Sequence, residues 1–294
     1  EEGFQVKGEF VTDKDGQTRY FDEGSGNLVK DRFLNKDGKW YYLDDKGLLV
    51  KGAQTIKGQK LYFDTKTGAQ VKGDFVADKD GNLTFYSGDS GQMVQSDFFS
   101  TGNNSWFSAD ENGHLLKGEQ TIKGQKLYFD TKTGQQVKGN FVLDKKGRRY
   151  YDADTGALVT NAFVETKAGS NKWYYMGADG YAVKGEQTIK TQHMYFDKES
   201  GQQAKGLVIM GSDGHKYFYD ANTGARVSNQ FVLVNGDWYY FGKDGAAVSG
   251  FQDINGQHLY FNPDGTQVKG KTVKIGSRYY SFDAQTGDIT AVTY

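Results

Sequence analysis

The chain has 294 residues and a formal net charge of −1, from 36 basic and 37 acidic side chains, so no basic surface points to nucleic-acid binding. It contains no cysteine, which excludes disulfides and thiolate chemistry. No apolar run approaches the roughly 20 residues that a membrane span needs. Only 36% of the residues are hydrophobic although 20 are Tyr and 20 are Phe, which favours many small aromatic cores. The sequence opens in mid-pattern with GFQVKG, so we expect a fragment of a longer protein.

Three kinds of unit, each of about 21–24 residues, alternate along the chain. The first A unit is Glu9–Val29, the first B unit is Arg32–Gly52, and the first C unit is Gln54–Gly73. The C unit returns as Gln120–Gly139 with one substitution, and more loosely twice again, the four starts being 66, 67 and 65 residues apart. We interpret residues 1–294 as one repeat region whose hairpin units start near residues 9, 32, 53, 74, 97, 119, 140, 162, 186, 207, 230, 251 and 271.

Each unit has the pattern of a β-hairpin. In the first C unit the turn Lys57-Gly58 leads into an aromatic strand, Leu61–Phe63. Gly-bearing turns supply the positive φ that tight hairpins need, and period-2 alternation places Tyr62 on the opposite face from its two neighbours. A lone hairpin is marginally stable in water, whereas stacked hairpins bury one another's aromatic faces. The sequence therefore predicts an all-β solenoid of stacked β-hairpin repeats, with about three hairpins per superhelical turn.

The positions of the acidic residues indicate that they form turns. They fall in turns, such as Asp13 and Asp78, or directly after the aromatic strands, such as Asp64 and Asp130. An active site is normally unique, whereas these acids are repeated, so we expect this chain to have no catalytic residue. The four histidines stand in different unit contexts without the clustering of metal ligands, and no phosphate loop or dinucleotide fingerprint is present. We therefore expect neither a metal nor a cofactor.

One polar set is kept in all four C units. A Gln precedes a Tyr by eight residues, a Lys follows the Tyr by nine or ten, and a second Gln lies between the Tyr and the Lys. This set suits a sugar, because a pyranose packs its C–H face on an aromatic ring while amide and ammonium groups meet its hydroxyls. Several weak sites in one chain would bind a polymer with avidity. The alternative is that Gln and Lys serve hairpin hydrogen bonding and solubility. The candidate binding residues are Gln54, Tyr62, Lys72, Gln120, Tyr128, Lys138, Gln187, Tyr195, Lys205, Gln252, Tyr260 and Lys269, and the second glutamines are Gln70, Gln136, Gln203 and Gln267.

Each B unit contributes one tryptophan, which either walls a pocket of the neighbouring C unit or belongs to the core. The candidate walls are Trp40, Tyr41, Trp106, Trp173, Tyr174, Trp238 and Tyr239.

The strings GAQTIKGQKLYFDTKTGAQVKG and DGKWYYLDDKGLLVKG resemble the glucan-binding repeats of streptococcal-type glucansucrases and related glucan-binding proteins, within the cell-wall and choline-binding repeat superfamily. The resemblance covers essentially the whole chain. It implies a non-catalytic β-solenoid region that binds α-glucan, dextran-like or mutan-like, through pockets of an aromatic ring, Gln and Lys. It also implies one of two parent chains at the bacterial cell surface. One is a secreted sucrose-dependent glucosyltransferase with a catalytic domain, and the other is a free glucan-binding protein, which carries similar repeats without being an enzyme.

Two units depart from the repeat pattern. The third C unit has Thr191, Met194 and Ala204 where the others have Gly, Leu and Val, and the second B unit has Phe107-Ser108 in place of Tyr-Tyr.

Two rival functions stand beside glucan binding. The first is choline binding to teichoic acid, for which a quaternary ammonium needs a cage of several aromatic rings. Choline-binding repeats begin with Gly-Trp, whereas this chain has no such dipeptide and carries Phe at the corresponding position, as in Phe33 and Phe98. The second rival is a structural or adhesive spacer, against which the kept Gln, Tyr and Lys count.

Overall fold

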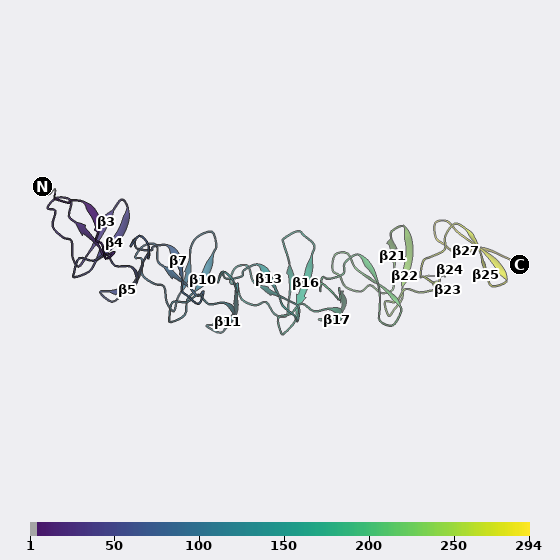
Figure 1. Ribbon diagram of the computed structural model, residues 1–294. Helices are drawn as coiled ribbons and strands as arrows, with labels where there is room; N and C mark the ends of the chain where they lie inside the picture. Colours follow the sequence, from purple (N-terminus) through teal and green to yellow (C-terminus); the bar gives the residue numbers. More distant parts are fainter. Residues whose placement is uncertain (1–4) are drawn as a thin grey trace. The chain divides into compact units, whose positions relative to one another are not determined.

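The computed structural model describes residues 5–294, which form 27 strands and no helix (Figure 1). The strands pair as thirteen consecutive antiparallel hairpins, the last of which gains a third strand. The predicted all-β repeat of stacked hairpins is confirmed. Because the described part of the chain is free of helices, it offers no helical segment that could cross a membrane.

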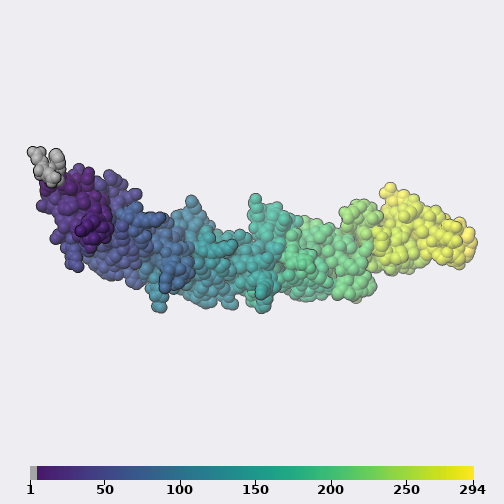
Figure 2. All heavy atoms as spheres, viewed as in Figure 1, coloured from purple at the N-terminus to yellow at the C-terminus, as the bar shows by residue number. Residues whose placement is uncertain are grey.

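The chain falls into two compact units. One holds the residues up to Lys138 together with Asp154–Ala157, and the other holds Gly139–Ala153 together with Leu158–Tyr294. Within each compact unit, hairpins that are consecutive in sequence are neighbours in space, as the gradual change of colour in Figure 2 shows.

The A hairpins have four-residue strands joined by an irregular loop. In the first of them the Asp13 carboxylate accepts hydrogen bonds from the backbone amides of Asp15 and Gln17, at 3.0 and 2.9 Å, which closes the loop. The A hairpins are β1 (Glu9–Thr12) with β2 (Thr18–Phe21), β7 (Asp74–Ala77) with β8 (Leu83–Tyr86), β13 (Asn140–Leu143) with β14 (Arg148–Tyr151), and β19 (Leu207–Met210) with β20 (Lys216–Tyr219).

The B hairpins carry the tryptophans at the start or near the start of their second strand. They are β3 (Arg32–Lys36) with β4 (Lys39–Leu43), β9 (Phe98–Ser100) with β10 (Trp106–Ser108), β15 (Ala162–Glu165) with β16 (Trp173–Met176), and β21 (Gln230–Val234) with β22 (Asp237–Phe241).

The C hairpins are the most regular. In the first one Lys57 and Gly58 both have positive φ, 49° and 81°, the turn geometry that matches the twist of two antiparallel strands. The C hairpins are β5 (Gly52–Ile56) with β6 (Gln59–Phe63), β11 (Gly118–Ile122) with β12 (Gln125–Phe129), β17 (Gly185–Ile189) with β18 (Gln192–Phe196), and β23 (Gly250–Ile254) with β24 (Gln257–Phe261). The last hairpin joins β25 (Thr272–Ile275), β26 (Arg278–Phe282) and β27 (Ile289–Thr293).

A residue in the left-handed region stands at or just before the start of each hairpin and redirects the chain there. Glycine adopts this conformation at little cost, and Asn and Asp are the residues that next best tolerate it. These residues, with φ between 45° and 74°, are Gly8, Asp31, Gly52, Gly73, Ser96, Gly118, Gly139, Asn161, Gly185, Gly206, Asn229, Gly250 and Gly270.

The core is a series of small clusters rather than one interior. Between the first B and C hairpins, Tyr42 of the B hairpin forms one buried cluster with Ile56, Leu61 and Phe63 of the C hairpin. The Phe63 ring is fully buried and stands opposite Gly52 across the strand pair. Each hairpin is therefore stabilised mainly by its neighbour in sequence.

Candidate functional site

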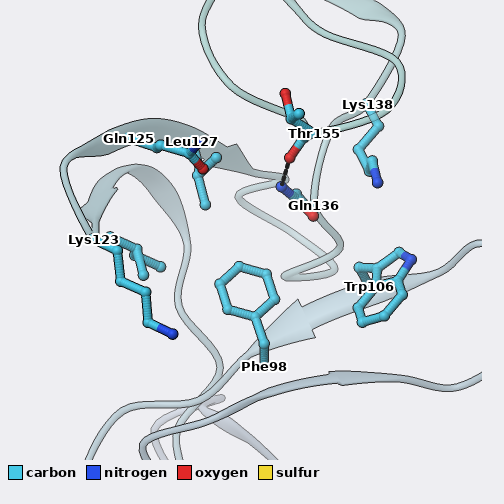
Figure 3. Close-up of a pocket in the computed structure, with 9 residues that line it drawn as sticks. Phe98, Trp106, Lys123, Gln125, Leu127, Gln136, Lys138 and Thr155 are labelled. Carbon is cyan, nitrogen blue, oxygen red and sulfur yellow. Dashed lines mark hydrogen bonds between the residues drawn. The ribbon is translucent and has the colours of Figure 1, made fainter.

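A pocket of about 250 Å³ lies in the first compact unit, between the second B hairpin and the C hairpin that follows it (Figure 3). Phe98 and Trp106 project into it from β9 and β10, and Leu127 faces them from β12. The side chains of Lys123 and Lys138 stand on opposite sides of the Phe98 ring. Ile122, Gln125, Gln136 and Thr155 complete the lining.

The strand register of the second B hairpin places the Phe98 and Trp106 side chains on the same face. Trp106 pairs with Ser100 and Phe98 pairs with Ser108. Directly opposed residues, and residues two apart on one strand, share a face of the sheet. Phe98 and Trp106 therefore project from one face of β9–β10, and Trp106 keeps 37% of its surface exposed.

A backbone hydrogen bond ties the C unit to the tryptophan. The amide N of Gln136 donates to the carbonyl of Trp106 at 2.8 Å. This contact brings the Gln136 side chain, and two residues later Lys138, beside the indole. The Lys138 Nζ lies 5.9 Å from the centroid of the Trp106 ring.

The glutamine contact recurs in the other three copies, and the lysine contact recurs in two of them. The second Gln of each C unit donates its backbone amide to a tryptophan carbonyl at 2.7–2.8 Å. The ammonium groups of Lys205 and Lys269 lie 5.1 Å from the Trp173 and Trp238 ring centroids. We call each set a Trp–Gln–Lys groove; the four are Trp40/Gln70/Lys72, Trp106/Gln136/Lys138, Trp173/Gln203/Lys205 and Trp238/Gln267/Lys269.

A glycine of the next unit makes room for each of these glutamine amides. A Cβ added at Gly156, whose φ is 73°, would lie 2.2 Å from the Gln136 Nε2. The amide instead passes the glycine and donates to the carbonyl of Thr155 at 3.4 Å. The same close approach occurs between Gln70 and Gly91, Gln203 and Gly224, and Gln267 and Gly287. The glutamine amides are thus fixed in place by the following A unit or last hairpin.

The first glutamine of each C unit binds its own backbone. The Gln54 Nε2 donates to the carbonyl of Lys51 at 2.9 Å, and the Gln120 Nε2 donates to Lys117 at 2.8 Å. The corresponding bonds of Gln187 and Gln252 go to Lys184 and Ser249 at 2.7 and 2.8 Å. These amides brace the entry to the C hairpin.

The structure does not bring the first Gln and the Tyr of a C unit together. Tyr62 pairs with Ala53, whereas Gln54 pairs with Leu61, so the Gln and Tyr side chains lie on opposite faces of the hairpin. Tyr62 instead packs toward the following A hairpin, with its ring centroid 5.7 Å from that of Tyr86. Tyr195 likewise packs toward Tyr219 of the following A hairpin, at 5.9 Å between ring centroids, and Tyr260 packs toward Phe282 of the last hairpin at 6.3 Å. Tyr128 pairs with Glu119 on the face away from the pocket.

The candidate walls divide between the two faces of the B hairpins. Trp40, Trp106 and Trp238 are 36–41% exposed and Trp173 is half-buried, all on the groove face. The neighbouring tyrosines turn the other way. Tyr41 and Tyr174 contact the preceding A hairpin, with ring centroids 4.9 Å from those of Phe10 and Phe141, and Tyr239 lies 6.1 Å from Phe241.

The repeated acids hold loops together. Asp64 accepts hydrogen bonds from the backbone amide and hydroxyl of Thr67, at 2.7 and 2.8 Å, which holds the pKa of the Asp64 carboxyl below its ordinary value. Asp130 has the same partners in Thr133 and the same direction of pKa shift. Among residues 5–294, no three His, Asp or Glu side chains gather in a way that could hold a metal ion.

Sequence reasoning missed the apolar lining of the pocket and the role of the second glutamine. Phe98, Ile122 and Leu127 look like core residues, and Gln136 is one repeated polar residue among several. The available signal was the hairpin register, because counting outward from the Lys123-Gly124 turn pairs Gln120 with Leu127 and places both on the face opposite Tyr128.

Comparison with known proteins identifies the repeats. The family model described as "Choline-binding repeat" matches residues 1–33, 50–98, 116–163, 183–231 and 248–294. The model described as "Putative cell wall binding repeat" matches residues 31–49, 163–182 and 229–247, which are three of the four B units.

Two curated streptococcal proteins contain similar sequences. Glucosyltransferase-S of Streptococcus mutans is 42% identical over 238 residues, which cover 80% of this chain and 16% of the relative. Glucosyltransferase-I of Streptococcus downei is 39% identical, covering 97% of this chain and 20% of the relative. The chain thus spans a fifth or less of the length of these relatives. The resemblance to glucosyltransferase repeats that the sequence predicts is confirmed.

Solved structures share the architecture. CbpJ from Streptococcus pneumoniae TIGR4 superimposes with a TM-score of 0.54 at 17% identity, covering 88% of this chain and 99% of that chain. At that identity the match bears on the fold alone. With family repeats matched over most of its length, the chain belongs to the family of choline-binding and cell-wall-binding repeats.

Proposed function

We propose that this chain is a non-catalytic region that binds α-glucan through its four Trp–Gln–Lys grooves. The observation that carries the proposal is the repeated placement of a lysine ammonium and a fixed glutamine amide beside an exposed indole face. A glucosyl ring would lie on the indole while Lys and Gln meet its hydroxyls. In this proposal the Gln54-type and Tyr62-type residues support the grooves by holding the C hairpins in place.

The grooves suit a neutral sugar better than a quaternary ammonium. A cation binds over an aromatic face because the ring quadrupole attracts it. In three of the grooves that face already has a lysine ammonium 5.1–5.9 Å from the ring centroid. A second cation would be repelled there, whereas a hydroxyl can accept a hydrogen bond from the same lysine.

The wider context is the bacterial cell surface. Cell-wall-binding repeats associate the chain with that surface, and the named relatives are glucosyltransferases. We therefore propose that the parent protein is a secreted glucosyltransferase that makes α-glucan from sucrose, and that this region holds a dextran-like or mutan-like product.

The test is calorimetric titration of the chain with isomalto-oligosaccharides and, separately, with choline. We expect saturable heat with the oligosaccharides and none with choline. Changing Trp40, Trp106, Trp173 and Trp238 together to Ala should abolish the oligosaccharide signal. A control variant changes Tyr279 and Tyr294 to Ala, since these tyrosines are exposed aromatic residues outside the grooves. This control should bind as the unaltered chain does.

The other outcomes separate the rival functions. Saturable choline binding would assign the chain to choline recognition. Absence of heat with either ligand, together with unretarded migration in a dextran-containing native gel, would leave the spacer function. Loss of binding in a Tyr62/Tyr128/Tyr195/Tyr260 to Ala variant, with full binding in the Trp variant, would move the sites to the opposite face of the C hairpins.

A further inference from the structure

The second B hairpin has a serine at a buried position where the other three have a tyrosine. Ser108 pairs with Phe98, whereas the equivalent pairs are Tyr42 with Phe33, Tyr175 with Phe163, and Tyr240 with Phe231. The Phe is therefore kept in all four copies, and its tyrosine partner is replaced by serine in one.

In the other copies the tyrosine ring fills the space beside the C hairpin. The Tyr42 ring lies 4.9 Å from Phe33 and belongs to one buried cluster with Ile56 and Leu61. Tyr240 lies 4.8 Å from Phe231, and both pack against the cluster of Ile254, Leu259 and Phe261. Tyr175 likewise packs against the cluster that contains Ile189 and Met194.

Ser108 has no ring with which to fill the equivalent space. Phe98, Ile122 and Leu127 are the counterparts of Phe33, Ile56 and Leu61, the residues that pack around Tyr42, and all three line the pocket of about 250 Å³. Ile122 is only half-buried, whereas Ile56, Ile189 and Ile254 are 7–8% exposed. The replacement of tyrosine by Ser108 therefore removes a packed ring and extends the Trp106 groove inward as far as the Phe98 ring.

We infer that the four grooves are not equivalent and that the Trp106 pocket is the primary glucosyl site, in which one glucosyl ring inserts between Trp106 and Phe98. This inference rests on the proposed function. The pocket is smaller than the roughly 300–1,000 Å³ of sites for drug-sized ligands, so it takes one sugar ring rather than several.

The lining fits such a ring. Phe98, Leu127 and Ile122 bury the C–H groups of the sugar ring. Burial of apolar surface favours binding, and the other three grooves bury less of the ring. Lys123 and Lys138 at the two sides, with Gln125 and Gln136, offer hydrogen-bond partners to the hydroxyls around its edge. The position of Ser108 therefore determines which of the repeated grooves binds most tightly.

The chain provides a site-resolved test. It contains four tryptophans, one in each groove, so its nitrogen-15 NMR spectrum has four indole N–H signals, which single Trp→Phe variants assign. Titration with isomaltotriose should shift the Trp106 signal at about tenfold lower concentration than the other three, equivalent to about 1.4 kcal/mol. In Ser108→Tyr the Trp106 midpoint should rise to that of the other tryptophans, because the ring occupies the pocket.

Ser108→Tyr restores the residue of the other three copies. Titration midpoints of Trp40, Trp173 and Trp238 that equal those in the unaltered chain verify that the variant is folded. One shared midpoint for all four indoles in the unaltered chain would overturn the inference, as would a Ser108→Tyr variant that keeps a tight Trp106 response. Failure of the proposed function is a different result, in which isomaltotriose moves none of the four signals.

Discussion

At the scale of single residues, each Trp–Gln–Lys groove depends on a glycine that the groove itself does not contain. A Cβ at Gly91 would lie 2.2 Å from the Gln70 Nε2, and Gly91 also has a φ of 72°. We expect Gly91→Ala to lower the free energy of unfolding by more than the roughly 1–3 kcal/mol that a strained backbone position costs. Urea and thermal unfolding measure the loss.

Gly58→Ala is the matched control for that substitution. Gly58 has a φ of 81° and open space where its Cβ would stand, so it reports the backbone strain without the collision. Adding Gln70→Ala should recover part of the Gly91→Ala loss and none of the Gly58→Ala loss. Equal losses for the two glycine variants would show that the amide of Gln70 is not held by its contact with Gly91.

Substitutions at Tyr42 measure how much a tyrosine ring stabilises the position that Ser108 occupies in the second B hairpin. Tyr42 is 7% exposed, packs on Ile56 and Leu61, and donates a hydrogen bond to the Asp31 carboxylate, which raises the pKa of Tyr42 to about 12. Tyr42→Ser should cost on the order of 3 kcal/mol, because it removes a buried ring. Tyr42→Phe keeps the ring and should cost about 1 kcal/mol for the lost hydrogen bond.

Hydrogen exchange gives the readout, because repeat proteins open locally. Amides of β3–β6 should exchange faster in Tyr42→Ser, while those of β21–β24 keep their protection. Unchanged exchange in β3–β6 would mean that the aromatic cluster contributes little to holding the B and C hairpins together.

At the scale of the element, an aspartate closes the loop after the second strand in three of the four C hairpins, and the fourth has Asn262 at that position. Asp64, Asp130 and Asp197 accept hydrogen bonds from a backbone amide and a hydroxyl three residues later, and these bonds lower the pKa of each carboxyl. Asp283 in the last hairpin is held in the same way. The ionised aspartate is therefore the form that stabilises the fold.

The sign of the pH dependence follows. A carboxyl whose pKa is lower in the folded state contributes fully above its unfolded pKa of about 4 and loses that contribution as pH falls through the lower folded value. We expect the Tm to be flat above about pH 5 and to drop steadily below about pH 4. The variant with Asp64, Asp130, Asp197 and Asp283 changed to Asn should show a shallower drop, because Asn accepts the same bonds without titrating. An identical slope would mean that other carboxyls control acid unfolding.

The sequence predicted the hairpins but not which side chains share a face. Turn pairs such as Lys57-Gly58 and the alternation around Tyr62 are local, so they specify hairpins without knowledge of the rest of the chain. Gln54 and Tyr62 do not share a face as predicted. Gln54 pairs with Leu61, seven residues later, so Tyr62 is one residue beyond the paired position and its side chain points to the opposite face. The contact of Trp40 with Gln70 depends on how one hairpin docks on the next, which the repeat pattern does not specify.

At the scale of the whole molecule, residues 5–294 carry four grooves, two in each compact unit. Each groove offers one exposed indole and few polar groups, so we expect its affinity for a short oligosaccharide to be weak. A polymer that engages a second groove does so at the effective concentration set by the first, and linked sites can gain about 10²–10⁴ in overall affinity without any new contact. Binding to long glucan should therefore depend on the number of intact grooves.

We expect single Trp→Ala changes to have unequal but partial effects on dextran binding, and paired changes to reduce it by more than the product of the single effects. Retardation in native gels that contain dextran measures this, with isomaltotriose titration as the monovalent reference. The exposed positions of Trp40 and Trp238 make them suitable for substitution, because little packing is lost. If dextran bound no more tightly per glucosyl unit than isomaltotriose, the grooves would act independently and the repetition would need another explanation. A steep loss of dextran binding as grooves are removed, at constant isomaltotriose affinity for the grooves that remain, would establish avidity as the reason that one groove is built four times.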